Sequence, residues 1–221
     1  MTTNAKNFAE DVGFEDETAN AFDFKKYAGV KGQTDRLAFV CLNPATGKPI
    51  VKKAQTHYVE GLGYIKANEY TIKRFGKPKA RYVTIVGQYA TNKLGKIENP
   101  KNMVIVCKFF IMPEKKYALL KAANEEFPLQ KHDLLSTCQE EKFQQLQFQS
   151  CKEAAWVLIP EIKAGVLEQV AVMSPYLENQ LCQDLTVEQI KEKLNDVEET
   201  PVEDATAETT EASADAIIAD L

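Results

Sequence analysis

Two apolar segments in the middle of the chain restrict the fold more than any other feature of the sequence. They are RYVTIVGQYA (residues 81–90) and NMVIVCKFFI (residues 102–111). Their side chains alternate with a period of two, which is typical of strands with two distinct faces. The stretch TNKLGKIENPK between them is polar and basic, so it predicts a hairpin loop in contact with water.

Further strands and one helix surround this hairpin. Strands are expected at residues 35–42, 56–65, 132–139 and 142–151, and glycines 61 and 63 predict a bulge or tight bend in the second of them. Pro113 opens EKKYALLKAANEEF, whose apolar residues follow helical spacing. Five or six strands interrupted by one helix predict a mainly β, α+β fold: an OB-fold-like barrel with one inserted helix.

The two ends of the chain differ from this centre. Residues 1–30 are expected to form an N-terminal arm, and residues 31–195 the OB-fold domain with a helical C-terminal extension. The last of these helices follows Thr186, which stands three residues before Gln189 at capping-box spacing. Residues 196–221 carry nine acids, no base and no aromatic residue, which predicts a disordered acidic tail.

Several classes of protein are disfavoured by what the sequence lacks. The five cysteines are scattered without a CxxC pair, so neither a disulfide scaffold nor a zinc site is expected, and we predict no metal and no cofactor. No apolar run is long enough to span a membrane, and the N-terminus lacks a secretory signal, which predicts a cytoplasmic protein. Nucleotide-binding and hydrolase motifs are absent, so we do not expect an enzyme.

Charge is distributed unevenly along the chain. Residues 48–121 contain sixteen Lys and Arg residues and four Glu residues, although the whole chain has a net charge of −5. Aromatic residues are interleaved with these bases. Cations that neutralise phosphates, together with rings that stack on bases, are what single-stranded nucleic acid requires. The basic segment therefore predicts a binding surface for single-stranded DNA that does not read sequence.

The residues expected to form this surface belong to two groups. The cations are Lys66, Lys73, Arg74, Lys77, Lys79 and Arg81 beside a groove, Lys93, Lys96 and Lys101 on the hairpin loop opposite, and Lys108 on its strand. The rings are Tyr70, Phe75, Tyr82 and Tyr89, with Tyr58, Tyr64 and Phe110 behind them. Packing in the core is the alternative role of each ring, and it is expected for about half of them.

The acidic tail has two expected roles. It ends in an apolar pattern among aspartates, formed by Ile217, Ile218, Ala219, Asp220 and Leu221. This pattern suits a short peptide that docks in a basic, apolar-floored pocket of a partner protein. Because the tail is a polyanion, it is also expected to compete with DNA for the basic surface. An inert solubility tag is the alternative.

With these residues in view, the chain resembles the OB-fold single-stranded-DNA-binding proteins of tailed phages, the T-even helix-destabilising proteins among them. The similar elements are GQTDRLAFV, THYVEGLGYI, the strand–loop–strand–helix from YVTIVGQY to YALLKA, FQQLQFQSCKEAAW and LTVEQIKEKL. The chain departs from the T-even pattern in one respect. The zinc module of that family has no His or Cys counterpart around IKANEYTIKRFGKP.

The resemblance implies that the protein coats exposed DNA during phage DNA replication, recombination and repair. It also implies recruitment of polymerase, helicase or primase through the tail, self-association through the N-terminal arm, and a place in the cytoplasm of the host cell. Two alternatives stay open: an RNA-binding OB protein, and a non-enzymatic phage interaction protein whose basic segment meets an acidic partner.

Overall fold

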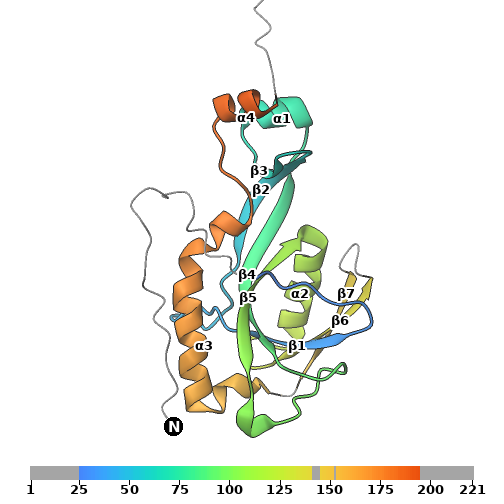
Figure 1. Cartoon of the computed structure of the whole chain (residues 1–221), viewed down its shortest axis with the longest axis vertical. Coiled ribbons are helices and arrows are strands. Elements are labelled where there is room, and N and C mark those ends of the chain that lie inside the picture. Colours follow the sequence, from blue (N-terminus) through green and yellow to red (C-terminus); the bar gives the residue numbers. More distant parts are fainter. Residues whose placement is uncertain (1–24, 141–144, 152, 195–221) are drawn as a thin grey trace, which may run out of the picture. The chain divides into compact units, whose positions relative to one another are not determined.

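A computed structural model describes residues 25–140, 145–151 and 153–194. Contacts divide the chain into two units, Met1–Asp184 and Leu185–Leu221. The first unit is a mixed α+β structure built on a mostly antiparallel sheet of seven strands (Figure 1). The predicted tail at residues 196–221 and most of the predicted N-terminal arm lie outside the described residues.

The sheet is organised around one long strand. Its strands are β1 (Thr34–Phe39), β2 (Lys52–Val59), β3 (Gly63–Lys66), β4 (Lys79–Tyr89), β5 (Ile105–Pro113), β6 (Leu134–Glu140) and β7 (Gln145–Ser150). β5 pairs with β4 over nine residue pairs, from Arg81↔Pro113 to Tyr89↔Ile105. The other edge of β4 pairs first with β2 and then with β1, and the strand order is β3-β2-β4-β1-β6-β7.

The two faces of β4 and β5 are both buried, which is why both strands read as apolar. One face, with Ile85, packs against helix α3 (Pro160–Met173). The opposite face, with Val86, packs against helix α2 (Glu114–Glu126). Figure 1 shows the two helices on opposite sides of these strands. The predicted alternation along residues 81–90 is therefore confirmed, and it separates two hydrophobic clusters.

Most predicted elements occur close to the expected positions. The helix that follows Pro113, the strands at residues 132–139 and 142–151, and the Thr186–Gln189 capping box of α4 (Val187–Lys193) are confirmed. The prediction of one strand at residues 56–65 is wrong, because these residues belong to two strands, β2 and β3, that pair as an antiparallel hairpin. Gly61 and Gly63 carry the chain around this hairpin with positive φ angles of 80° and 76°, which glycine adopts without strain.

A short helix, α1 (Glu69–Phe75), follows β3 and is not among the elements that the sequence predicts. The Asn68 side chain accepts a hydrogen bond from the Thr71 backbone amide at 2.9 Å, and the Thr71 hydroxyl accepts one from the Asn68 amide at 2.8 Å. These two bonds satisfy donors at the helix start that have no partner within the helix. Gly76 ends α1 with a φ of 78°.

Residues before β1 also belong to the folded unit. The backbone of residues 25–27 pairs with Phe109 of β5, and the Tyr27 side chain is buried. Part of the predicted N-terminal arm is thus built into the sheet. None of the helices in the described ranges is long and apolar enough to cross a membrane.

Two buried tyrosines predict a loss of stability in alkaline solution. Burial is the main cause that raises the pKa of Tyr27 and of Tyr89 far above 10, and nearby Asp35 and Asp133 raise them further. Above about pH 10 the unfolded chain releases these protons while the folded chain keeps them, so stability falls as pH rises, by about 1.4 kcal/mol per pH unit for each tyrosine. Urea unfolding between pH 9 and 11 measures this slope.

The variant Tyr27→Phe is the control for this prediction, because it removes one of the two ionisable groups. Its unfolding free energy is expected to fall less steeply with pH than that of the wild type. Equal slopes for the two proteins would contradict the assignment of Tyr27.

Candidate nucleic-acid interface

Several exposed rings and cations of the basic segment lie on one part of the fold. We call β2, β3 and α1 the hairpin–helix module (residues 52–75). In Figure 1 this module lies at the start of β4, at the opposite end of that strand from the β4–β5 loop. β2 and β3 form an antiparallel hairpin, in which Tyr58 pairs with Tyr64 and Val59 with Gly63.

The most exposed rings of the module are a cross-strand pair. Tyr58 is 68% exposed and Tyr64 is 42% exposed, and their ring centroids lie 5.1 Å apart in an edge-on arrangement. The Arg81 guanidinium carbon lies 3.5 Å from the centroid of the Tyr64 ring, and Arg81 also donates a hydrogen bond to the Leu181 carbonyl. Arg81 therefore restrains Tyr64 from one side, while Tyr58 keeps most of its surface in contact with water.

A second aromatic site lies on the α1 side of the module. Phe75 is 36% exposed, and its ring centroid lies 5.7 Å from that of His57 on β2. Arg74 lies over the same phenylalanine ring and also donates a hydrogen bond of 3.4 Å to the Tyr70 hydroxyl. The predicted pair Tyr70 and Phe75 thus belongs to a helix that carries bases.

The cations of the module are mostly exposed. The exposed cations are Lys66, Lys73 and Arg74 in the module and Lys77 and Lys79 directly after it, whereas Arg81 of β4 is half-buried. Among the described residues no carboxylate lies within 4 Å of Lys73, Lys77 or Lys79. These charges are therefore available for an anionic ligand.

Acids from a distant segment lie on the Tyr64 side of the module. Lys66 Nζ lies 2.6 Å from Asp184 Oδ2, and Lys52 Nζ lies 2.8 Å from Glu178 Oε1. The backbone of Gln183 pairs with β3 next to Ile65, which keeps this segment in place. All four charged side chains are exposed, so each ion pair contributes little stability. The pairs lower the positive charge of this side.

Three predicted stacking residues are in the core, so their assignment is wrong. Tyr82 is 8% exposed, Tyr89 is 2% exposed and Phe110 is 1% exposed. Tyr82 stacks on Tyr117 of α2, and Phe110 packs edge-on against Tyr27. Each of the three rings is covered by another part of the fold: Tyr82 by α2, Phe110 by Tyr27, and Tyr89 by the cluster around α3. None of the three is therefore open to a base.

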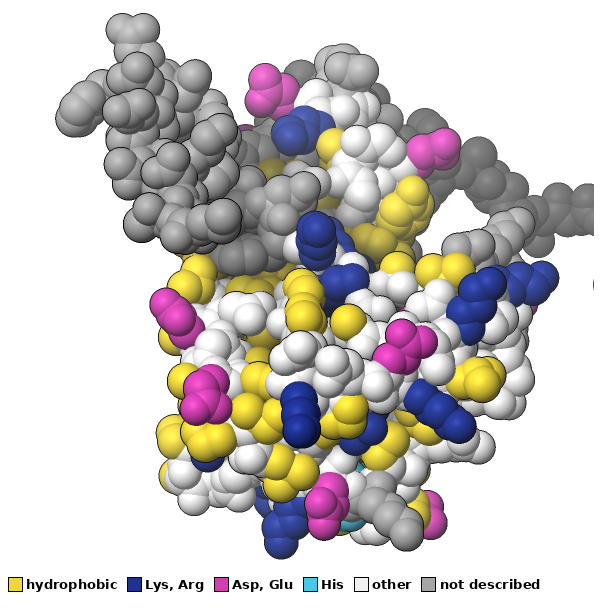
Figure 2. All heavy atoms as spheres, turned by 60° about the horizontal axis from the view of Figure 1, so that its bottom comes forward, with side chains coloured by type: hydrophobic (Ala, Val, Ile, Leu, Met, Phe, Trp, Pro, Cys, Tyr) yellow, Lys and Arg dark blue, Asp and Glu magenta, His cyan; other side chains and the backbone are white. Residues whose placement is uncertain are grey.

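The remaining predicted cations lie far from the module. Lys93, Lys96 and Lys101 belong to the loop that follows β4 and are exposed. β4 has eleven residues, so about 33 Å of strand separates Lys79 from this loop. Figure 2 brings that end of the molecule forward and shows basic side chains interspersed with acidic and apolar ones. The single trough expected from the sequence is therefore not formed by these residues.

Lys108 belongs to a different, mixed-charge cleft of about 320 Å³. Its ammonium donates a hydrogen bond of 2.6 Å to Gln88 Oε1. The cleft also contains Lys25 and the buried Asp35, which accepts hydrogen bonds from Tyr27 and Gln33. The nearby carboxylate makes this a weaker anion site than the hairpin–helix module.

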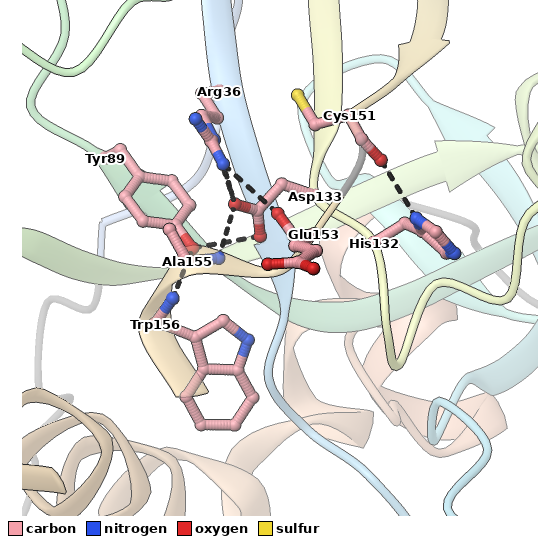
Figure 3. Close-up of polar contacts among 8 residues, drawn as sticks. All are labelled: Arg36, Tyr89, His132, Asp133, Cys151, Glu153, Ala155 and Trp156. Atoms are coloured by element: carbon pink, nitrogen blue, oxygen red, sulfur yellow. Dashed lines mark hydrogen bonds and ion pairs between the residues drawn. The ribbon is translucent and has the colours of Figure 1, made fainter. Parts of the chain in front are cut away.

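The structure contains a buried polar cluster around Asp133 that the sequence did not predict. Asp133 is fully buried and accepts hydrogen bonds from Arg36 Nε at 2.8 Å, the Tyr89 hydroxyl at 2.9 Å and the Ala155 amide at 3.0 Å (Figure 3). The Tyr89 hydroxyl in turn accepts a bond of 3.0 Å from the Trp156 amide. These hydrogen bonds join β1, β4 and the segment after β7.

Three of the five cysteines, Cys41, Cys107 and Cys138, are buried, and Cys151 and Cys182 are half-buried. All five are free, and burial raises the pKa of Cys107 to about 12. In the part of the chain that the structure describes, no three His, Cys, Asp or Glu side chains are grouped as a metal site would need. Comparison with protein-family models, curated protein sequences and solved structures finds no match to this chain.

Proposed function

We propose that the protein binds single-stranded DNA, without reading its sequence, through the hairpin–helix module. The observation that carries the proposal is the exposed Tyr58–Tyr64 pair, together with Lys73, Lys77 and Lys79, which have no carboxylate within 4 Å among the described residues. The two tyrosines form an adjacent exposed pair of rings, and each ring that stacks on a base contributes about 1–3 kcal/mol. Every base offers a flat face, so binding of this kind is sequence-independent.

We propose further that the central sheet is a variant of the OB arrangement. β4 pairs with β1 on one edge and with β5 on the other. β1 pairs in turn with β6, and β6 with β7. In the sequence, α2 lies between β5 and β6. That order supports the proposal, whereas a pairing of β5 with β7, which would close a barrel, is not found among the described residues. The hairpin–helix module then occupies the loop between the first two barrel strands, a usual binding loop in this fold.

The biological role that we propose is that of a phage protein in the host cytoplasm, not an enzyme, which coats exposed DNA in replication, recombination and repair. Recruitment of polymerase, helicase or primase is assigned to the acidic tail ending in Ile217, Ile218, Ala219, Asp220 and Leu221, and self-association to the N-terminal arm. The tail and residues 1–24 of the arm lie outside the described residues. An RNA-binding protein is the second candidate, because the same cations and rings suit either strand type.

Titration of labelled oligo-dT and of a duplex of equal length, at 50 mM and 200 mM salt, tests the proposal. We expect tighter binding to oligo-dT than to the duplex. With five exposed cations on phosphates, the logarithmic salt slope is expected to be about −3.5. Fluorescence anisotropy is the suitable measurement, because Trp156 is buried and is not expected to contact DNA. Equal affinity for the two forms would contradict the proposal.

A further inference from the structure

A cleft of about 220 Å³ lies between the loop before β2 and helix α2. Its walls are mainly apolar with two lysines among them, and the lining residues are Lys48, Pro49, Val51, Tyr117, Leu120, Lys121, Asn124 and Leu129. The volume is below the range of about 300–1,000 Å³ that is typical of sites for drug-sized ligands. A single ring system is therefore the size of group that suits this cleft.

A stacked pair of rings forms one side of the cleft. The Tyr82 and Tyr117 centroids lie 4.0 Å apart with an interplanar angle of 9°. Tyr82 is buried, so the part of the pair that reaches the cleft is the half-buried Tyr117. Because Tyr82 already restrains the Tyr117 ring, Tyr117 loses little conformational entropy when a base stacks on it. This favours stacking in the cleft.

One face of the strand leads from the cleft, which Val51 lines, to the α1 side of the hairpin–helix module. Val51, Lys53, Gln55 and His57 alternate along the strand and share one face, and Lys53 and Gln55 are exposed. Lys53 Nζ lies 5.7 Å from the Tyr82 centroid, and His57 contacts Phe75. From His57 to Val51 the strand rises by about 20 Å, which several nucleotides would span.

Polar groups at the cleft suit a nucleotide. Asn124 Oδ1 accepts a hydrogen bond of 3.1 Å from the Leu129 amide, and in the described ranges the two N–H groups of the Asn124 side chain make no hydrogen bond. Lys48 has no carboxylate within 4 Å among the same residues, and Lys121 Nζ is 4.0 Å from Glu125 with both side chains exposed. A base edge can accept from Asn124 while phosphates contact the lysines.

We propose that this cleft is a second subsite for single-stranded nucleic acid, which holds one base against Tyr117 while the adjoining phosphates contact Lys48 and Lys121. The inference rests on the proposed function and extends its binding surface from Phe75 along β2 to α2. A base uses the flat tyrosine stack, the amide donors and the lysines together. An apolar acidic peptide would use the apolar walls and the lysines but not the stack, so the base is the better fit.

Photocrosslinking of the full chain to oligo-dT with one 5-iododeoxyuridine tests the subsite. We expect mass spectrometry to map a crosslink to Tyr117 as well as to rings of the module. The variant Lys48→Gln/Lys121→Gln is expected to make the logarithmic salt slope shallower by about 1.4, which corresponds to two phosphate contacts. Its matched control is Lys131→Gln/Lys163→Gln, which replaces two exposed lysines elsewhere and should leave the slope unchanged.

The contrary results distinguish failure of the subsite from failure of the proposed function. Crosslinks confined to residues 52–75, or an unchanged salt slope, would overturn the subsite and leave the proposed function standing. Failure of the wild type to bind oligo-dT would overturn both. If the methyl resonances of Val51 and Leu129 shift with an acidic peptide of residues 214–221 and not with oligo-dT, the cleft belongs to a peptide and the inference is wrong.

Discussion

Replacing Tyr58 and Tyr64 together by alanine is expected to weaken the binding of single-stranded DNA by at least about 30-fold. The two rings have 68% and 42% of their surface exposed, and a stacked base is worth about 1–3 kcal/mol per ring. Two rings at the lower end of that range give about 2 kcal/mol. Because neither side chain belongs to the core clusters, the unfolding free energy should change little. Anisotropy titration at constant salt measures the loss.

The variant Phe127→Ala is the matched control, because Phe127 is a ring 36% exposed at the end of α2, away from the hairpin–helix module. It should bind DNA as the wild type does. Tyr70→Ala/Phe75→Ala tests the α1 side in the same assay and is expected to weaken binding by more than the loss of one lysine. If the Tyr58→Ala/Tyr64→Ala protein bound single-stranded DNA with the affinity of the wild type, these two rings would not be part of the interface.

Asp133→Ala is expected to have the largest effect on stability, a loss of about 3–5 kcal/mol of unfolding free energy. Asp133 is fully buried, and its removal leaves the Arg36 guanidinium without its ion pair at 2.7 Å. The hydroxyl of Tyr89 and the amide of Ala155 lose their acceptor at the same time (Figure 3). Urea unfolding at neutral pH measures the change.

Asp184→Ala serves as the control for this prediction, because it also removes an aspartate from an ion pair, but an exposed one with Lys66. Its cost should lie within about 1 kcal/mol. If Asp133→Ala were as stable as Asp184→Ala, the buried cluster would not hold β1, β4 and the segment after β7 together as we describe.

The core of the sheet could be predicted from the sequence because its signal is local. Val83 and Ile85 alternate with Tyr82 and Thr84 along one strand, and the pattern is complete within ten residues. The exposed or buried state of each ring could not be predicted in this way. Tyr82 is covered by α2, which begins 32 residues later in the chain, and Tyr89 by the cluster around α3, a helix that begins 71 residues later.

The Arg36–Asp133 ion pair and helix α1 have weak or no signals in the sequence around them. Arg36 and Asp133 are 97 residues apart, and nothing in the sequence near either one indicates their ion pair. Helix α1 has only seven residues, and its available sign was the Asn68–Thr71 spacing, which differs from the usual capping box ending in Glu or Gln. The β2–β3 turn did have a visible sign in Gly61 and Gly63.

The central claim is that rings on the hairpin–helix module stack on unpaired bases. Comparing the affinity of oligo-dT with that of an abasic oligonucleotide of equal length tests it most directly, because the two ligands carry the same phosphates and differ in their bases. We predict that the abasic strand binds at least about 30-fold more weakly, and that Tyr58→Ala/Tyr64→Ala removes most of this difference. Equal affinity of the wild type for both strands would contradict the account.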